Sequence, residues 1–147
     1  MARTSFAAGS LDADNPTLSV AATIDAPILQ VRDVEPGEHF GYGSTHTATK
    51  KMRTATVAVG YADGFLRCLG GRGYGVLGGR KTPILGRVSM DLTIVDVTGN
   101  DAAAPGAMVE FLGANAPLDD VAKRAGTAAY EILTTFAGTV RRSGVRG

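Results

Sequence analysis

The sequence contains a single cysteine, Cys68, and its formal net charge is only +1. One cysteine permits no disulfide within the chain and no metal site built from several cysteines. A charge this close to zero gives no bulk electrostatic reason to bind nucleic acid or a membrane surface. We therefore expect a protein with no nucleic-acid partner and no membrane partner.

Long apolar runs are also missing. The first ten residues, MARTSFAAGS, contain no apolar stretch of the length found in signal peptides. Nowhere does the chain approach the roughly 18 consecutive apolar residues that cross a membrane. The lone cysteine is compatible with a reducing compartment. These features together predict a soluble, cytoplasmic protein.

Glycine, in contrast, is abundant, with 20 among the 147 residues, against an average of roughly 7%. Hydrophobic residues make up 44% of the chain and charged residues 20%, which is enough apolar material for the core of one domain. Glycine is frequent at turns and bulges. Its abundance therefore predicts a β-rich fold.

A β-type pattern begins after residue 17. Residues 1–17 are small and polar without periodicity, so we expect a tail or linker there and one domain over 18–147. β-Branched and partly alternating segments predict strands at 18–24, 27–34, 54–62, 92–97 and 108–113, and a hairpin over 73–88. The hairpin is expected to turn at Gly78-Gly79.

Helical signals occur only near the C-terminus. Residues 118–126 carry acids in the first turn, bases in the last turn and Gly126 where a C-terminal cap is expected. Thr127 suits the N-cap of a second helix over 128–136, and TVRR is a candidate final strand. Strands and helices do not alternate, so a doubly wound fold is excluded. We predict a mainly β fold, a small Greek-key-like β-barrel with one or two short helices near the C-terminus.

Common catalytic and metal-binding patterns are absent. His39 and His46 lie on either side of Tyr42, without the carboxylates or cysteines that would complete a metal site. The glycines of residues 70–79 form no phosphate-binding motif, and no serine lies in a GxSxG elbow. Asp63 is interpreted as a turn residue. No metal is therefore expected.

Gly41-Tyr42-Gly43 places a phenol between two residues that have no side chain. A turn covered by an aromatic ring would explain it. A phenol presented where a ligand passes close to the backbone would explain it equally well. Tyr61, Met90 and Tyr130 pose the same choice, because each residue type also serves ordinary packing. Residue types alone leave these positions open.

Four stretches are more informative in combination: EPGEHFGYGSTHTA, VAVGYADGFLR, PILGRVSMDLTIVDVT and LDDVAKRAGTAAYEILTTF. In this order they closely resemble the C-terminal domain of the alanine racemases, from about Leu18 to Arg142. The resemblance implies a pyridoxal-phosphate enzyme, an isomerase that converts L-alanine to D-alanine for peptidoglycan. It also implies an N-terminal (β/α)8 barrel that carries the cofactor lysine. In the homodimer of this family, the C-terminal domain completes the active site of the other subunit.

The resemblance also implies roles for the four open positions. Tyr42 matches the catalytic tyrosine, and Tyr61 matches a tyrosine that lines the substrate access channel. Met90 matches a residue whose backbone N–H faces the substrate carboxylate, and Tyr130 matches a tyrosine near the cofactor phosphate. As a phenolate, Tyr42 would serve one face of the substrate Cα while the lysine serves the other. A free phenol has a pKa near 10, so it needs cationic neighbours to act as a base at neutral pH.

The sequence departs from the family most clearly in what it does not contain. A (β/α)8 barrel needs at least about 200 residues, and the lysines of this chain do not lie in a segment of that kind. They are Lys50, Lys51, Lys81 and Lys123. We therefore expect an excised domain or a short gene product that holds no cofactor covalently and is inactive in isolation. His46 and the final TVRR also differ from the commoner family pattern.

Two alternative functions remain open at this point. The chain could be a stand-alone, non-catalytic β-barrel module that binds a protein partner such as a racemase barrel. It could also belong to a racemase of serine or of broad specificity, because much of the side-chain pocket would lie in the missing barrel. In either case we expect an apolar patch around Tyr42, Tyr61 and Met90, with self-association or disordered loops there.

Overall fold

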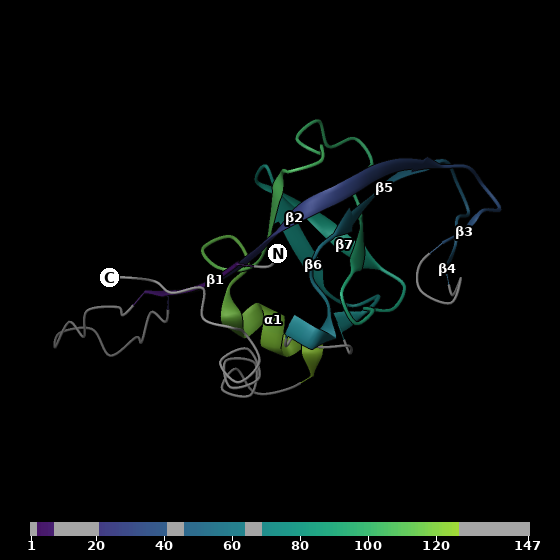
Figure 1. Ribbon diagram of the computed structural model, residues 1–147. Coiled ribbons are helices and arrows are strands. Elements are labelled where there is room, and N and C mark those ends of the chain that lie inside the picture. The colour runs from purple at the N-terminus through teal and green to yellow at the C-terminus, as the bar shows by residue number, and fades with distance from the viewer. Residues whose placement is uncertain (1–2, 8–20, 41–45, 64–68, 127–147) are drawn as a thin grey trace, which may run out of the picture.

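Figure 1 shows the computed structural model, which describes residues 3–7, 21–40, 46–63 and 69–126. Its strands are β1 (Arg3–Ala7), β2 (Ala21–Val34), β3 (His39–Phe40), β4 (His46–Thr47), β5 (Met52–Val57), β6 (Tyr74–Leu77), β7 (Arg80–Leu85), β8 (Thr93–Asp96) and β9 (Met108–Leu112). Its helices are the 3-10 helix η2 (Tyr61–Asp63) and the α-helix α1 (Leu118–Ala125).

Six of these strands close into a β-barrel. Their order is β2-β5-β8-β7-β6-β9, with β9 pairing back onto β2, and all neighbours are antiparallel. β6, β7 and β8 are successive neighbours, and β5 lies beside β8, which is a Greek-key order. The predicted mainly β, Greek-key-like barrel is therefore confirmed.

The barrel interior is filled by the alternate residues of its strands. On β2, Ile24, Ala26 and Ile28 are almost completely buried. On β6 a side chain is excluded at Gly75, because a Cβ there would overlap Val109 of β9. Glycine at this position thus makes room for the core side chain of Val109 on the neighbouring strand β9.

The turn signals of the sequence are confirmed in the described part of the chain. Gly78 (φ 58°) and Gly79 (φ 79°) join β6 to β7 with both residues in the left-handed region, as a two-residue hairpin requires. Gly37 and Gly106, which each follow a proline, also have positive φ. Gly126 (φ 70°) ends α1, and its N–H contacts the carbonyls of Ala122 and Lys123.

The expected strand boundaries differ from the structure in three places. The two strands predicted at 18–24 and 27–34 are one continuous strand, β2. Its pairing register shifts between Ile24 and Asp25 against β9, and between Ile28 and Gln30 against β5. These bulges let one strand serve two neighbours, and they interrupt the alternation that the sequence pattern relies on.

The other two differences lie at β5 and at the N-terminus. The strand predicted over 54–62 ends at Val57, and the chain then turns into η2. Within the segment 1–17, expected to be a tail or linker, residues 3–7 form β1, which pairs antiparallel with the start of β2. The second helix expected at 128–136 and the TVRR strand lie outside the described residues.

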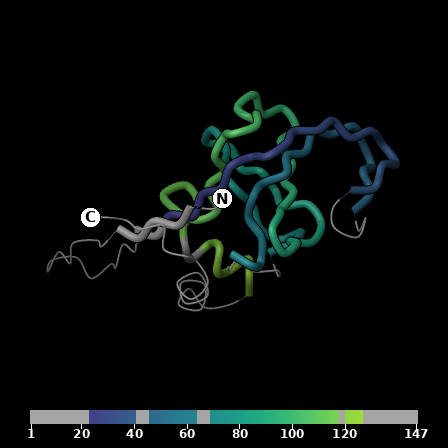
Figure 2. The backbone as a smooth tube through the Cα atoms, in the orientation of Figure 1, coloured from purple at the N-terminus to yellow at the C-terminus, as the bar shows by residue number. Residues whose placement is uncertain are grey.

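In Figure 1, β2 runs from the side of β1 to the end of the molecule at which β3 lies, and Figure 2 shows the same path of the β2 backbone in purple and blue. There the β3–β4 hairpin projects, while α1 lies at the other side of the barrel (Figure 1). Within the described residues, no helix has the length and apolar character needed to cross a membrane.

Candidate functional site

Tyr61 and Met90 come from separate parts of the chain and lie together in the fold. The N–H of Tyr61 donates to the carbonyl of Ser89 at 3.0 Å, and the N–H of Ala62 donates to the carbonyl of Met90 at 2.9 Å. These bonds join η2, which comes after β5, to the loop that connects β7 and β8. The structure thus brings together the GYADG and SMD blocks of the sequence.

Gly60 allows this close approach. A Cβ at this position would overlap the backbone of Ser89 and Met90, so the two loops can touch only where residue 60 has no side chain. Asp63 closes the turn, because its Oδ2 accepts from the N–H of Gly60 at 3.0 Å. Asp63 is therefore the turn residue that its sequence context predicts.

The loop that carries Met90 is held by hydrogen bonds of its own. The Ser89 hydroxyl donates to the carbonyl of Leu92 at 2.8 Å and accepts from the N–H of Leu92 at 3.0 Å. The Thr93 hydroxyl donates to the carbonyl of Val59 at 2.6 Å, which ties β8 to the segment between β5 and η2. The backbone on both sides of the contact is thus held by hydrogen bonds within the chain itself.

The side chains on this fixed backbone remain open to solvent. Met90 is 52% exposed, Tyr61 41% and Leu92 38%. Tyr61 and Met90 lie on loops that hydrogen-bond to each other, and Leu92 follows two residues after Met90. Exposed apolar side chains that gather in one area typically mark a binding surface. We call these three residues the apolar surface.

Tyr42 lies outside the described residues, but the hairpin that carries its loop is described. In the β3–β4 pair, Phe40 opposes His46, and the two rings are 4.8 Å apart between centroids. His39 Nδ1 lies 2.9 Å from the Thr47 hydroxyl. The sequence predicted none of these contacts, and they give His39 and His46 structural roles at the base of the loop.

A second, smaller core anchors this hairpin to the barrel. Its buried members are Val34, Phe40, Ala48 and Met52. The N–H of Gly37 donates to the carbonyl of Ala48 at 2.8 Å, which closes the approach from β2. The loop of Tyr42 therefore starts and ends on a packed support.

Tyr130 also lies outside the described residues, four positions beyond the helix cap at Gly126. Of the four predicted site residues, the structure therefore describes Tyr61 and Met90 and brings them together. Within the described residues, no three His, Cys, Asp or Glu side chains group as metal ligands.

A cluster around Tyr74 was not singled out by the sequence patterns. Tyr74 is only 7% exposed, and its hydroxyl donates to Asp120 Oδ2 on α1. Lys81 Nζ lies 4.6 Å from the centre of the Tyr74 ring, and the Arg124 guanidinium carbon lies 4.9 Å from it. Burial and the hydrogen bond to Asp120 raise the pKa of Tyr74 to about 12. The same hydrogen bond, with the Arg124 charge, lowers the pKa of Asp120.

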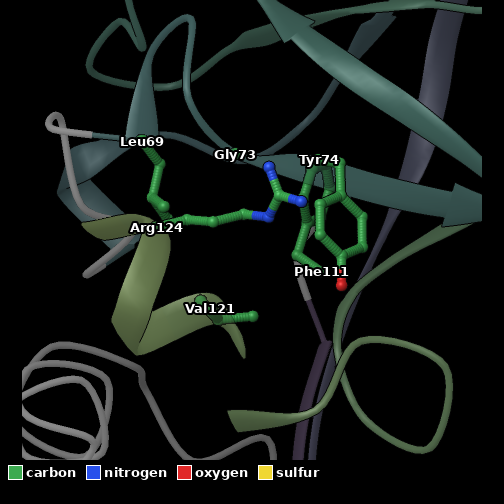
Figure 3. A pocket seen from close by; sticks show the side chains of 6 residues that line it. All are labelled: Leu69, Gly73, Tyr74, Phe111, Val121 and Arg124. Carbon is green, nitrogen blue, oxygen red and sulfur yellow. The ribbon is translucent and has the colours of Figure 1, made fainter. Parts of the chain in front are cut away.

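The hollow beside this cluster is too tight for a water molecule. Figure 3 shows the side chains that line it: Leu69, Gly73, Tyr74, Phe111, Val121 and Arg124. A ligand pocket needs far more space. The sequence signal that could have drawn attention to this cluster is Gly73-Tyr74-Gly75, a second tyrosine between two glycines. In the structure Tyr74 is buried and has a packing role.

The apolar surface fits one wall of a cofactor site and cannot enclose a cofactor. Tyr61 and Met90 are exposed to solvent, whereas protein normally surrounds most of the surface of a bound cofactor such as pyridoxal phosphate. Two of the lysines are engaged elsewhere, since Lys81 lies over the Tyr74 ring and Lys51 Nζ lies 3.7 Å from Glu35 Oε1. The remaining walls must come from other residues.

Comparison with known proteins gives consistent matches. A family described as "Alanine racemase, C-terminal domain" matches residues 21–144. An alanine racemase of Rhodospirillum rubrum is 45% identical over 142 residues, covering 90% of this chain and 38% of the relative. One from Methylobacterium sp. is 46% identical over 122 residues, covering 82% of this chain and 34% of the relative.

Solved structures agree with these matches. Alanine racemase from Bartonella henselae, with covalently bound pyridoxal phosphate, superposes with a TM-score of 0.78 at 36% identity, covering 83% of this chain and 34% of that one. The biosynthetic alanine racemase from Pseudomonas aeruginosa gives 0.77 at 36% identity, covering 91% and 37%. The chain spans little more than a third of the length of these relatives.

Proposed function

The chain belongs to the alanine racemase C-terminal domain family, and on that premise we propose that it completes the active site of a pyridoxal-phosphate-dependent alanine racemase. The observation that carries the proposal is the contact between the Tyr61 and Met90 loops. Two blocks typical of the family meet through hydrogen bonds, and the large apolar side chain that each contributes, Tyr61 or Met90, is exposed. The cofactor lysine and the (β/α)8 barrel would be supplied by residues outside this sequence.

In this proposal Tyr42 transfers a proton at one face of the substrate Cα. Pyridoxal phosphate, when bound, supplies the electron sink that makes this proton acidic. A phenol with a pKa near 10 needs cationic neighbours to accept a proton at neutral pH. The two histidines at the base of its loop are engaged with Thr47 and Phe40, so we assign the activating cations to the barrel.

Met90 and Tyr61 would bind and guide the substrate. A carboxylate accepts hydrogen bonds, so the backbone group that Met90 can offer it is the N–H, while the carbonyl of Met90 accepts from the N–H of Ala62. Tyr61 would line the access channel from the neighbouring loop. Tyr130 would lie near the cofactor phosphate.

We also propose the partners and location that the family suggests. The apolar surface would be covered by a (β/α)8 barrel, in the full-length enzyme that of a second subunit in a homodimer. The product, D-alanine, would supply peptidoglycan synthesis from the cytoplasm. Alanine is proposed as the substrate on the strength of the relatives, with serine as the variant to be compared.

The test is reconstitution with a separately expressed (β/α)8 barrel domain. The chain is mixed with this barrel domain and pyridoxal phosphate, and the racemisation of L-alanine and of L-serine is followed by circular dichroism. We expect no turnover from the chain alone, turnover from the mixture, and loss of about 10²-fold or more with Tyr42→Phe. Leu29→Gln, an exposed change on β2, is the matched control.

Each alternative has its own outcome in this experiment. Turnover by the chain alone would overturn the proposal that the barrel is required. Binding to the barrel without turnover would favour a non-catalytic interaction module. Faster turnover of serine than of alanine would reassign the substrate and leave the rest of the proposal intact.

A further inference from the structure

The loop between β7 and β8 turns two consecutive carbonyl groups toward the same side. The carbonyl of Ser89 accepts from the N–H of Tyr61 at 3.0 Å, and the carbonyl of Met90 accepts from the N–H of Ala62 at 2.9 Å. Both carbonyl oxygens also lie 2.4 Å from the position that a Cβ of Gly60 would take. The hydrogen bonds and this convergence therefore place both carbonyls on the side of η2.

The orientation of these carbonyls decides the orientation of two N–H groups. A trans peptide is planar, so its N–H points away from its C=O, and the described chain contains no cis peptide bond. The N–H of Met90 shares a peptide plane with the Ser89 carbonyl, and the N–H of Asp91 shares one with the Met90 carbonyl. Both N–H groups therefore point away from η2, to the opposite side of the loop.

These two N–H groups, of Met90 and Asp91, donate no hydrogen bond within the described residues, whereas the N–H groups of Ser89 and Leu92 on either side of them are bonded. Consecutive N–H groups that point to one side of a turn form an anion site, because their partial positive charges add. A carboxylate can accept both through its two oxygens. The Asp91 carboxylate lies on the same loop, and because it is exposed, water weakens its repulsion of a bound anion.

Ser89 holds the loop in this orientation. Its N–H and its hydroxyl both donate to the Leu92 carbonyl, at 3.0 Å and 2.8 Å, and its hydroxyl accepts from the Leu92 N–H at 3.0 Å. Its carbonyl accepts from Tyr61, so every polar group of Ser89 is engaged. The hydroxyl joins the two ends of the loop 89–92, and a side chain without it would leave the residues between them less restrained.

We propose that Ser89 is a positioning residue, which holds the N–H groups of Met90 and Asp91 on one side of the loop as a pair of donors for the substrate carboxylate. This inference rests on the proposed function, which assigns the carboxylate to the Met90 N–H alone. It adds a second donor and names the side chain that aligns both. Because both donors belong to the backbone, the residue types at 90 and 91 do not reveal them.

The first test is a titration of the chain with propionate, which is alanine without its amino group, followed by two-dimensional NMR of the amides. We expect the amide signals of Met90 and Asp91 to shift together. In Ser89→Ala the slope of these shifts against propionate concentration should fall about tenfold, as for weakened hydrogen bonds to a charged group. Ser89→Thr keeps the hydroxyl and should behave as the wild type. Propionamide, which has no negative charge, is the ligand control and should cause much smaller shifts.

The second test is the steady-state kinetics of alanine racemisation by the chain assembled with a (β/α)8 barrel domain and pyridoxal phosphate. A contact made equally to the substrate and the transition state affects KM and leaves kcat unchanged. We expect Ser89→Ala to raise KM about tenfold with kcat within about twofold of wild type, and Ser89→Thr to restore KM. The control is Thr98→Val, which removes another hydroxyl with two hydrogen bonds, from the N–H of Arg53 and to Asp96. It should leave KM and kcat unchanged at equal folded fraction.

Three results would overturn or divide the inference. Equal effects of Ser89→Ala and Thr98→Val on KM would reduce Ser89 to a contribution to stability. A propionate shift at Met90 without one at Asp91 would leave a single donor, and the wild-type titration decides this even if Ser89→Ala folds poorly. A wild-type assembly without racemase activity would overturn the proposed function, and the titration would still decide whether the two N–H groups bind a carboxylate.

Discussion

Gly60 controls how closely the two loops of the candidate site approach. The residue belongs to the turn that Asp63 closes, and any side chain would collide with the backbone of the Met90 loop. A backbone wall cannot move aside as a flexible side chain can. The distance between the Tyr61 and Met90 loops is therefore set by Gly60, a residue without a side chain.

We expect Gly60→Ala to destabilise the fold by about 1–3 kcal/mol, as overpacking does. It should also shift the amide resonances of residues 89–92 in an NMR spectrum. Gly99→Ala is the control, because Gly99 has φ 72° and open space around it, so it costs backbone strain of about 1–2 kcal/mol without a clash. Unmoved resonances at 89–92 in Gly60→Ala would contradict the assigned contact.

At the scale of elements, the sequence predicted a strand correctly where its residues alternate regularly or where a turn motif marks its end. The β6–β7 hairpin and β8 and β9 obey simple alternation or turn chemistry, and they were found near the expected residues. β2 was expected as two strands, because its bulges break the alternation while its hydrogen bonds continue. Pairing is a tertiary property, and a single strand does not encode it locally.

The site shows the same limit. The resemblance supplied Tyr61 and Met90, but not the Gly60 contact that joins them. The bond from Tyr74 to Asp120 spans 46 residues, so no local pattern indicates it. What spacing can predict is short-range, and the contacts that support a site are mostly long-range.

The attachment of α1 should depend on pH at both extremes. The pKa of Asp120 is lowered from 3.8 in the fold, so its stabilising effect is present above that value and is lost as pH falls below it. The pKa of Tyr74 is raised from 10.0 to about 12, so its effect is present below pH 10 and is lost as pH rises toward 12. The groups facing this pair are Lys81 and Arg124.

Thermal unfolding of the wild type and Tyr74→Phe as a function of pH checks this expectation. The Tm of the variant should be lower than that of the wild type by a constant amount between these limits, because the variant lacks one hydrogen bond to a charged group. It should shrink above pH 10, where the unfolded wild type begins to gain from ionising. A difference that stays constant through that range would contradict the assigned cause.

At the scale of the whole molecule, the domain combines a closed β-barrel with an exposed apolar surface. Its β-barrel has a closed ring of strands and a filled interior. Its apolar surface has exposed side chains held on a rigid backbone, a pattern typical of a surface that another chain covers. Without a partner on this surface, copies of the chain should associate through it.

We therefore expect the isolated chain to self-associate with increasing concentration, as measured by static light scattering. Tyr61→Ser combined with Met90→Ser should shift the distribution toward monomer, because it replaces two of the three exposed side chains of the apolar surface. Leu29→Ser, an equally exposed position on β2, is the control and should have a smaller effect. A monodisperse monomer at high concentration would argue against an interface at this surface.

Closure of the β-barrel through β2 and β9 has a consequence for the order in which the chain folds. Ile24 pairs with Leu112, so the ring cannot close until nearly the whole described chain has been synthesised. Until then one edge of β2 is unpaired, and the β2–β9 contacts that offset the entropy lost in joining distant segments have not formed. Folding of the β-barrel is therefore completed only when β9 pairs with β2. A nascent chain that stops before β9 would expose the unpaired edge of β2, which is prone to aggregation.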